Sequence, residues 1–353
     1  MKKAVVLGGT HDHITVIDLL KKRGYFTILI DYHNNPVARE YADCFIREST
    51  TDKEKVLEIA NKHNVTLVVS ACVESALATM VYVSTKLDLP CHINYETVLS
   101  VTNKTLMKDV FINNGIPTSK HITVDKDNLD NVKQLKLPLV IKPADANSSK
   151  GIQKIHSYDE CCDAYSNAVK YSKSKQVIAE EFIEGKELSV DVAVVNGKHN
   201  IVLITETIKS ETETSVFTIS ESRYPVKLLT SELNQLNDII KKIVKAYKLR
   251  NTPLLVQVLH SGQEFVVIEC SARIGGGSKH HLIKKITDCN VISFFLDMLE
   301  KRTINDISLT KHYSHASLKY IYSEPGVITN INTLEKEKHD KVIDEVFFIK
   351  PKG

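Results

Sequence analysis

The sequence predicts an α/β protein whose N-terminal part is a doubly wound parallel sheet and whose second part mixes strands with helices. Apolar strands alternate with amphipathic helices over the first hundred residues, which is typical of a parallel sheet covered on both faces. Asn196-Gly197 is a hairpin signal in the second part. A chain of 353 residues is long enough for two or three domains.

The first part consists of three predicted strands, each followed by a helix. Gly24 and Pro90 end the first and third helices, because neither residue type favours a continuing helix. The predicted strands are 3–9, 26–31 and 66–71, and the predicted helices are 14–24, 52–64 and 74–89.

The first turn, GGTHDH at residues 8–13, invites a dinucleotide interpretation. It lacks the full GxGxxG pattern of dinucleotide-binding turns. An NAD(P)-dependent oxidoreductase would use Gly8, Gly9 and Asp31, with Asp31 contacting a ribose. A tight strand-to-helix turn is the simpler interpretation.

The second part begins near residue 100. Its first helix ends at Gly115 and Pro117, and a later helix carries one apolar stripe from Leu233 to Tyr247. The predicted helices are 103–117, 159–172 and 232–249, and the predicted strands are 137–144, 152–157, those within 176–204, and two within 253–272 around Ser261-Gly262. The polar stretch 209–225 is long for a connection, and we expect a substrate-side loop there.

Composition excludes some function classes. Hydrophobic residues make up 42% and charged residues 25%, and the net charge of +3 gives no case for a nucleic-acid partner. No stretch approaches the ~20 apolar residues of a membrane span. The seven cysteines are scattered without a CxxC pair, which predicts reduced thiols in a cytoplasmic protein.

The segment VVIECSARIGGG, residues 266–277, carries polar residues at every second position. Strict alternation places Glu269, Ser271 and Arg273 on one face of a strand, together with Val267. The glycines that follow, 275–277, let a substrate approach the backbone closely. The alternative to a functional site on this strand face is a structural ion pair between Glu269 and Arg273.

Three stretches fit the binding of a nucleoside triphosphate with magnesium. Lys142 precedes the small-residue loop 145–151, and an ammonium group with turned backbone N–H groups suits phosphate oxygens. In AEEFIEGKE, residues 179–187, Glu180 can accept from an adenine amine, Glu181 and Ile183 can offer backbone groups, and Glu187 can accept from ribose hydroxyls. A surface lysine before a turn and a charged strand edge are the alternatives.

The third stretch offers hard oxygen ligands. Gln257 lies roughly opposite Glu269 in a predicted hairpin, and Ser271 can complete or support the ligand shell of a metal ion bound there. Magnesium, or manganese in its place, prefers such ligands and leaves other positions to phosphate and water. Arg273 can meet the charge of a transferred phosphoryl group or a carboxylate.

The order of four motifs resembles the ATP-grasp superfamily, in particular its carboxylate–amine ligases and carbamoyl-phosphate synthase-like members. The motifs are NKTLMK…GIP, LPLVIKPADANSSKGI, AEEFIEGKELSV and VQVLHSGQEFVVIECSARIGGG. The resemblance covers nearly the whole chain. It implies a Rossmann-like N-terminal domain at 1–100, a small ATP-grasp subdomain at 101–183 and a large one at 184–353, with ATP between the two subdomains.

The resemblance also implies roles for single residues. Lys104 and Lys142 correspond to lysines that meet ATP phosphates, and Glu187 corresponds to the ribose-binding acid. The phosphate loop corresponds to Ser148, Ser149 and Gly151, the adenine hinge to Glu180, Glu181, Phe182 and Ile183, the metal ligands to Gln257, Glu269 and Ser271, and the substrate contacts to Arg273, Gly275, Gly276 and Gly277. Gln257 and Ser271 depart from the usual Glu and Asn, so one of two magnesium ions is expected to be held loosely.

The resemblance implies an ATP-dependent ligase that joins a small-molecule carboxylate to an amine through an acylphosphate. RIGGG resembles the amino-acid ligases, which favours an amino acid as one substrate. Arg223 is a further candidate substrate or phosphate contact, and His280 and His281 either face the acceptor or cap a helix. A non-catalytic ATP-binding protein stays open as an alternative. A homodimer is expected by analogy alone.

Overall fold

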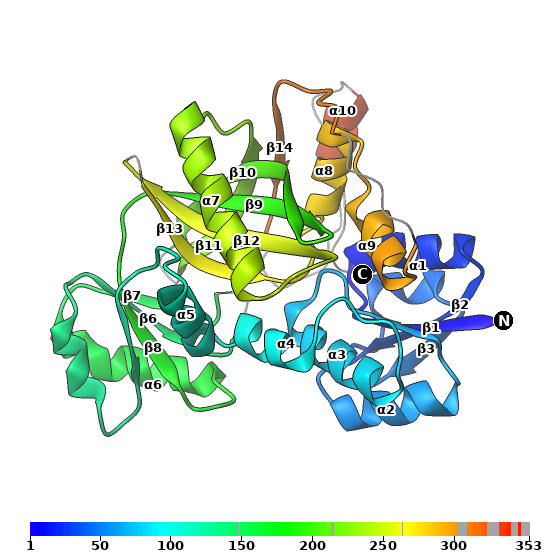
Figure 1. The fold of residues 1–353 in the computed structure, drawn as a ribbon, viewed down its shortest axis with the longest axis horizontal. Coiled ribbons are helices and arrows are strands. Elements are labelled where there is room, and N and C mark those ends of the chain that lie inside the picture. Colours follow the sequence, from blue (N-terminus) through cyan, green and yellow to red (C-terminus); the bar gives the residue numbers. More distant parts are fainter. Residues whose placement is uncertain are drawn as a thin grey trace. The chain divides into compact units, whose positions relative to one another are not determined.

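A computed structural model describes residues 1–146, 149–212, 215–262, 264–302, 309–322, 332–339 and 345–346. The chain divides into two compact units (Figure 1). Among the described residues, unit 1 contains Met1–Pro90, Gly275–His281 and those from Ile321 onward, and unit 2 contains Cys91–Ile274 and Leu282–Tyr320.

Unit 1 is built on a four-stranded sheet in the order β3-β2-β1-β4, in which every pair of neighbours is parallel. The strands are β1 (Lys2–Leu7), β2 (Tyr25–Asp31), β3 (Cys44–Arg47) and β4 (Leu67–Val69), and the helices are α1 (His11–Lys22), α2 (Lys53–Lys62) and α3 (Leu77–Lys86). The predicted parallel α/β fold is confirmed. The short strand β3 was not predicted, because its apolar run, Cys44 to Ile46, is only three residues long.

The turn between β1 and α1 is held by Asp31. The backbone N–H of Gly9 donates to Asp31 Oδ2 at 2.7 Å, and that of His33 donates to Asp31 Oδ1 at 2.8 Å. Strand β1 ends at Leu7 because Gly8 takes a φ of +107°, which side chains disfavour. A β-carbon on Gly9 would lie 2.4 Å from Pro36. The geometry therefore favours the tight-turn interpretation over a ribose contact by Asp31.

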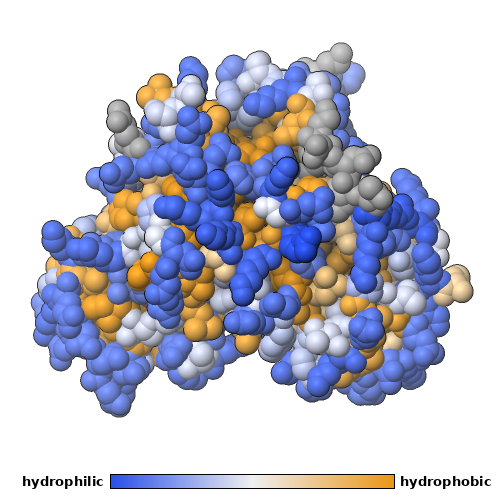
Figure 2. All heavy atoms as spheres, in the orientation of Figure 1, coloured by the Kyte–Doolittle hydropathy of each residue, from blue (hydrophilic) through white to orange (hydrophobic). Residues whose placement is uncertain are grey.

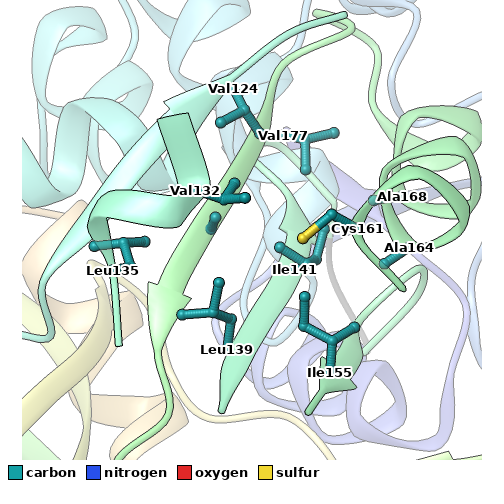
Figure 3. Packing of buried hydrophobic residues seen from close by; sticks show 11 residues of the cluster. Val124, Val132, Leu135, Leu139, Ile141, Ile155, Cys161, Ala164, Ala168 and Val177 are labelled. Atoms are coloured by element: carbon teal, nitrogen blue, oxygen red, sulfur yellow. The ribbon is translucent and has the colours of Figure 1, made fainter. Parts of the chain in front are cut away.

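The smaller sheet of unit 2 is antiparallel, in the order β5-β8-β6-β7. Its strands are β5 (His121–Val124), β6 (Leu139–Pro143), β7 (Gln153–Ile155) and β8 (Val177–Glu181), and helix α6 (Cys161–Tyr171) packs on one face. Figure 3 shows the core between them, where Ile141 lies among the buried residues, and Ala179 belongs to the same cluster. Alternation along β6 and β8 then puts Lys142 and Glu180 on the opposite face.

The larger sheet of unit 2 has the order β13-β12-β9-β10-β11-β14, and all its pairs are antiparallel. Its strands are β9 (Lys186–Val195), β10 (Lys198–Thr212), β11 (Ser215–Tyr224), β12 (Thr252–Ser261), β13 (Glu264–Ser271) and β14 (Ala316–Lys319). Helix α7 (Thr230–Ala246) lies across one face (Figure 1), as its apolar stripe predicts. Asn196 and Gly197 join β9 to β10 with φ of 51° and 80°, which confirms the predicted hairpin.

The stretch 209–225 is not the predicted loop. Most of it lies in β10 and β11, which pair with each other, and β14 pairs along the far edge of β11. The pairing register shifts twice, between Ile208 and Lys209 and between Ser210 and Thr212. These shifts break the alternation of polar and apolar residues that identifies a strand in a sequence, so the segment looked like a polar connection.

The other helices are α4 (Tyr95–Thr102), α5 (Lys104–Asn113), α8 (Lys279–Thr287), α9 (Val291–Leu299) and α10 (Asn332–His339). Hydrophilic residues are interspersed with hydrophobic ones over the face drawn in Figure 2. Within the described residues, every helix is too short or too polar to cross a membrane.

Candidate active site

Helix α5 presents two lysines to the interior of unit 2. Asn103 caps the helix, because its Oδ1 accepts from the backbone N–H groups of Thr105 at 3.0 Å and Leu106 at 3.2 Å. The buried positions of α5 follow an i, i+3, i+4, i+7 stripe on one face. They are Lys104, Met107, Lys108 and Phe111.

Lys104 holds the start of the predicted phosphate loop. Its Nζ donates to the carbonyl oxygen of Ala146 at 2.7 Å, and its backbone N–H donates to that of Ala144 at 2.7 Å. The Asp145 carboxylate accepts from the hydroxyl of Ser172 at 2.8 Å and from the backbone N–H of Ser174 at 2.8 Å. The loop therefore leaves β6 from a fixed point beside a buried ammonium group.

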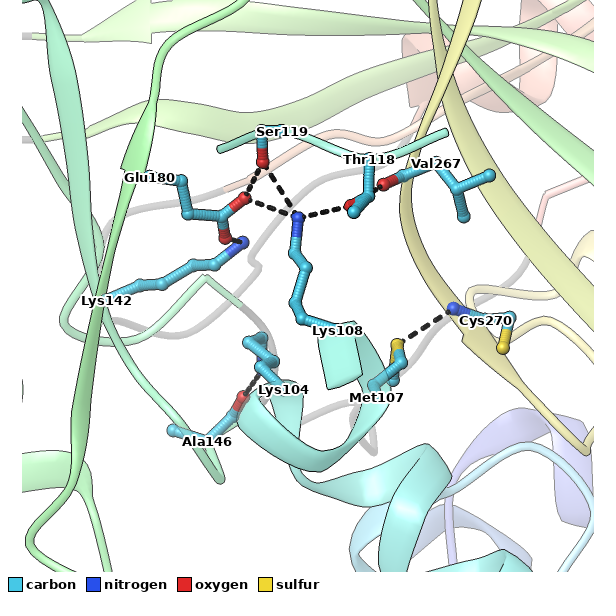
Figure 4. Close-up of polar contacts among 10 residues, drawn as sticks. All are labelled: Lys104, Met107, Lys108, Thr118, Ser119, Lys142, Ala146, Glu180, Val267 and Cys270. Carbon is cyan, nitrogen blue, oxygen red and sulfur yellow. Dashed lines mark hydrogen bonds and ion pairs between the residues drawn. The ribbon is translucent and has the colours of Figure 1, made fainter. Parts of the chain in front are cut away.

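Three charged side chains meet behind this loop (Figure 4). Lys108 Nζ donates to Glu180 Oε2 at 2.8 Å, and Lys142 pairs with Glu180 Oε1. The side chains of Lys142 and Glu180 are each 7% exposed and that of Lys108 is 1% exposed. We call Lys108, Lys142 and Glu180 the buried ion cluster.

Opposing effects set the pKa values in the buried ion cluster. Burial raises the pKa of the Glu180 carboxyl, but Lys142 and Lys108 outweigh burial and bring this pKa far below its usual range. Burial lowers the pKa of Lys108, Lys142 lowers it further, and Glu180 and Glu269 oppose the change. Glu180 is therefore an anion at neutral pH.

The predicted adenine hinge follows β8. Glu181 Oε1 accepts from the backbone N–H of Lys136 at 3.0 Å, and the backbone N–H of Phe182 donates to the carbonyl oxygen of Pro138 at 2.9 Å. Ile183 is partly exposed. Because the Glu180 carboxylate already has two cationic partners, its predicted contact with an adenine amine stays a prediction.

The predicted phosphate loop is described only in part. Ser148 lies outside the described residues. Ser149 has a φ of 56° and Gly151 a φ of 69°, and a β-carbon on Gly151 would lie 2.7 Å from the Tyr171 ring. Gly151 is therefore required by both the backbone conformation and the space available.

The predicted ribose acid, Glu187, lies on β9 beside a candidate metal ligand. Gln257 Nε2 donates to Glu187 Oε1 at 3.1 Å, and Lys209 pairs with Glu187 Oε2. Glu187 is 8% exposed. The lysine lies in the stretch that was expected to be a loop, so the sequence did not predict this partner.

The candidate metal ligands lie on the hairpin of β12 and β13. Gln257 pairs directly with Glu269, as predicted, and Ser271 follows on β13. The Ser271 hydroxyl is buried and has no hydrogen-bond partner within the described part of the chain. Because the Gln257 amide nitrogen donates to Glu187, its amide oxygen is the atom left for a ligand.

The predicted position of Val267 on the face of Glu269 is wrong. Val267 pairs with Val258 while Glu269 pairs with Gln257, so the ladder skips Ile268. Adjacent residues of β12 point to opposite faces, and their partners on β13 do the same. This β-bulge turns Val267 into the core and leaves Glu269 on the polar face.

Arg273 and the three glycines divide between the two units. Arg273 belongs to unit 2, and its Nη1 donates to the carbonyl oxygen of Ile274 at 2.9 Å. Gly275, Gly276 and Gly277 belong to unit 1, where a β-carbon on Gly276 would lie 3.2 Å from the carbonyl oxygen of Cys72. Gly277 has a φ of 68°. Their predicted substrate contacts stay predictions.

Among the described residues, no contact links Arg223 to the lysines of the site or to the metal-ligand hairpin. It lies on β11 and forms two hydrogen bonds with the Glu221 carboxylate, at 3.1 and 3.0 Å. Its side chain is 52% exposed. Together with Lys227 and His315 it lines a surface groove of about 350 Å³.

The two adjacent histidines lie within unit 1, in the first turn of α8, so they do not cap that helix from outside. His280 Nε2 lies 3.3 Å from the Thr15 hydroxyl, and its Nδ1 lies 3.5 Å from Asp12. The ring of His281 lies 4.1 Å from that of His280, measured between centroids.

Sequence reasoning missed Lys108. The signal was present, because Lys108 lies four residues after Lys104 and between the apolar residues Met107 and Phe111 on one helix face. A lysine in an otherwise apolar stripe must find a partner when the helix is buried. The partner, Glu180, is 72 positions away and could not be identified from spacing.

Comparison with known proteins identifies this arrangement. Residues 135–280 match the family model of the ATP-grasp domain. This region of the chain is similar to ATP-grasp domains. The match begins just before β6 and ends in the first turn of α8, so it contains Lys142, Glu180, Glu187 and the metal-ligand hairpin.

Similar whole proteins include ligases of amino acids. An L-arginine-specific L-amino acid ligase from Bacillus subtilis is 27% identical over 261 residues, which are 69% of this chain and 60% of that protein. This chain therefore matches less than two thirds of that relative's length. A crystal structure of an L-amino acid ligase from Bacillus licheniformis has a TM-score of 0.71 at 19% identity, covering 85% of this chain and 74% of that one.

A second solved structure extends the likeness in fold. The N5-carboxyaminoimidazole synthetase from Staphylococcus aureus, complexed with ADP, has a TM-score of 0.76 at 14% identity. The alignment covers 97% of this chain and 86% of that one. The fold predicted from the sequence is thereby confirmed.

Proposed function

We propose that this chain is an ATP-dependent carboxylate–amine ligase that forms an amide or peptide bond and takes an amino acid as one substrate. The observation that carries the proposal is the pairing of two features within unit 2. Lysines from α5 and β6 are buried beside the start of the phosphate loop, and an edge hairpin carries Gln257 directly opposite Glu269. Cations for phosphate and hard oxygen ligands for a metal are what ATP-driven phosphoryl transfer requires.

Lys104 and Lys142 are the proposed phosphate contacts. Lys104 Nζ is bonded to a loop carbonyl, and Lys142 is bonded to Glu180, so both ammonium groups are fixed before a nucleotide arrives. Groups fixed in advance need little reorganisation when charge develops in the transition state. Backbone N–H groups of the loop that contains Ser149 and Gly151 would add neutral donors.

The residues of the hairpin fit a magnesium ion. The Glu269 carboxylate, the Gln257 amide oxygen and the Ser271 hydroxyl are all oxygen donors, and the buried Ser271 hydroxyl lacks a protein partner in the described chain. When bound, magnesium or manganese would neutralise charge on the phosphates. With a single carboxylate among these three ligands, we expect weak binding of the ion in the absence of nucleotide.

The reaction balances as two displacements. A substrate carboxylate oxygen attacks the γ-phosphorus of ATP, the bond from that phosphorus to the bridging oxygen breaks, and ADP leaves. The amine nitrogen of the second substrate then attacks the acyl carbon, the C–O bond to phosphate breaks, and the nitrogen loses a proton to solvent. Lys104 and Lys142 hold the phosphates, and Arg273 orients the carboxylate.

The test is ADP release from ATP with magnesium in the presence of amino acids and other small carboxylates, supplied singly and in pairs. A supporting result is a pair that raises the rate together with a condensation product of the two substrates, detected by mass spectrometry. Glu269→Gln should lower that rate at least about 100-fold, because it removes the only carboxylate of the hairpin ligands. Glu264→Gln, on the exposed start of the same strand, is the matched control and should leave the rate unchanged.

Two other results would reject the proposal. ATP binding without ADP release under any pair would identify a non-catalytic nucleotide-binding protein. NAD(P) binding without ATP binding would identify the dinucleotide alternative at the first turn.

A further inference from the structure

We propose that Lys108 is a positioning residue of the nucleotide site, whose charge neutralises Glu180 so that Lys142 keeps its own positive charge for the triphosphate. This inference rests on the proposed binding of ATP. It assigns a function to the last residue of the NKTLMK motif, to which the sequence analysis gives no role. Its evidence lies entirely within unit 2 (Figure 4).

The contacts of Lys108 require its charged form. Its Nζ has three acceptors, which are Thr118 Oγ1 at 2.7 Å, Ser119 Oγ at 2.8 Å and Glu180 Oε2 at 2.8 Å. An ammonium group has three N–H donors and the neutral amine has only two. Every donor of the ammonium group is therefore used inside the protein, and none is left to bind a ligand.

Charge counting shows what Lys108 contributes. Lys142 and Lys108 contribute two positive charges and Glu180 one negative charge, so the buried ion cluster is a net cation. Without Lys108, the carboxylate and Lys142 would cancel each other. A polyphosphate would then meet a neutral pair in a poorly solvated site, where charges act most strongly.

Lys108 also links the cluster to the strand that carries Glu269. The Thr118 hydroxyl accepts from Lys108 and donates to the carbonyl oxygen of Val267 at 2.9 Å. The backbone N–H of Val267 donates to the carbonyl oxygen of Pro117 at 2.8 Å. One hydrogen-bonded chain thus runs from α5 to the bulge that separates Val267 from Glu269.

A second contact reaches the same strand from the adjacent residue of α5. The backbone N–H of Cys270 donates to Met107 Sδ at 3.3 Å. Strand β13 is at the edge of the larger sheet in the described part of the chain, and there Thr118 forms a single β-bridge with Val267. Glu269 is therefore flanked on both sides by residues tied to α5 or to the segment that follows it, which keeps the metal-ligand strand in register with the lysines.

The experiment compares the binding of ATP and of adenosine by the full chain. Adenosine lacks phosphate, so it reports the fit of the base and ribose alone. Dissociation constants are measured by calorimetry for ATP and by ligand-observed NMR for adenosine, with circular dichroism to check folding. The variants are Lys108→Met, the charge-preserving Lys108→Arg, and the double variant Lys108→Met with Glu180→Gln, which restores a net charge of one through Lys142.

We expect Lys108→Met to weaken ATP binding about 10- to 30-fold and adenosine binding no more than about twofold, because only the charge interaction is lost. The double variant should keep the ratio of the ATP and adenosine dissociation constants within about threefold of the wild-type ratio, because a change at the base affects both ligands alike. Lys108→Arg should keep the ratio of the two dissociation constants.

Equal losses for ATP and adenosine in Lys108→Met would overturn the inference, because a structural role alone would give that pattern. A double variant that fails to recover the wild-type ratio of the two dissociation constants would also overturn it. If Lys108→Met does not fold, the double variant decides alone, since it lacks both Lys108 and Glu180 and keeps Lys142 as the single charge of the cluster. If the wild type does not bind ATP, the proposed function fails first. If the wild type binds ATP and Lys108→Met keeps the wild-type ratio of the ATP and adenosine dissociation constants, only the inference fails.

Discussion

The buried ion cluster and the hairpin of Gln257, Glu269 and Ser271 lie in the same unit and differ in how completely their polar groups are satisfied. In the cluster, Lys108 uses all three donors and Glu180 has a cation on each oxygen. In the hairpin, the Ser271 hydroxyl is buried without a partner in the described chain. Lys108 and Glu180 are satisfied without a ligand, whereas the hairpin carries oxygen atoms that a bound metal ion would use.

This difference determines how a substitution in each region changes the stability of the native state. In a satisfied buried ion cluster, ion pairs and hydrogen bonds offset much of the cost of desolvation, but removing one member leaves an uncompensated charge. A buried hydroxyl without a partner costs the native state free energy continuously, and replacing it can stabilise the protein. Substitutions in the two regions should therefore have opposite effects on stability, and both should weaken function.

The largest expected effect on stability comes from Glu180→Gln. It leaves Lys108 and Lys142 buried without their anion, and we expect a loss of about 3–5 kcal/mol in the free energy of unfolding. The measurement is urea denaturation at pH 7. Glu181→Gln is the matched control, because its carboxylate is partly exposed and accepts from one backbone N–H, and it should cost no more than about 1 kcal/mol. Equal losses in the two variants would show that the cluster is not special.

Acid should remove the same stabilisation. Burial raises the pKa of Glu180, but the lysines outweigh it and the net pKa lies below that of the unfolded chain. The stabilisation is therefore fully present above the unfolded-state pKa of about 4.3 and is lost as the pH falls toward the folded-state pKa. The difference in unfolding free energy between wild type and Glu180→Gln should shrink below about pH 4, measured by urea denaturation from pH 7 to pH 3.

The contribution of buried histidines to the free energy of unfolding is lost in a different pH range from that of Glu180. Burial lowers the pKa of His13 and of His92 to about 4. Their contribution is present above the unfolded-state value of about 6.5 and is lost between pH 6.5 and 4. Both proteins in the comparison carry these histidines, so a difference that stays constant down to pH 3 would contradict the role given to Glu180.

Local patterns in the sequence were enough to predict the parallel sheet of unit 1, the hairpins and the pairing of Gln257 with Glu269. Each of these depends on residues that are close in sequence, such as Asn196 and Gly197. The buried ion cluster depends on contacts between α5 and β8, whose partners are 72 positions apart, so spacing carries no information about it.

Register irregularities account for two errors in the strands. The bulge at Ile268 reversed the face of Val267, and the shifts near Lys209 hid two strands in a polar stretch. Both errors assumed strict alternation, which a single extra residue is enough to break. Such irregularities depend on packing against neighbouring strands and cannot be read from one strand alone.

A smaller effect of opposite sign is expected from Ser271→Ala. Replacing a buried, unpartnered hydroxyl should leave the free energy of unfolding unchanged or raise it by up to about 1 kcal/mol. The same change should raise the magnesium concentration needed for half-maximal ADP release about 3- to 10-fold, because one oxygen donor is removed. A destabilised variant with an unchanged magnesium requirement would mean that the hydroxyl has a structural partner and no role in metal binding.

The smallest effect is expected at Arg223, and its comparison with Arg273 tests whether a catalytic arginine must lie beside the metal ligands. Arg223 bonds Glu221 on its own strand and is half exposed, and exposed pairs of this kind contribute little. Arg273 follows Ser271 by two residues on the segment that carries the metal ligands. We expect Arg223→Ala to change the rate of ADP release less than about threefold and Arg273→Ala to lower it at least about 100-fold. A comparable loss in both would place Arg223 in the substrate site, as the sequence predicts, and would mean that the β10–β11 hairpin reaches the reacting groups when substrates bind.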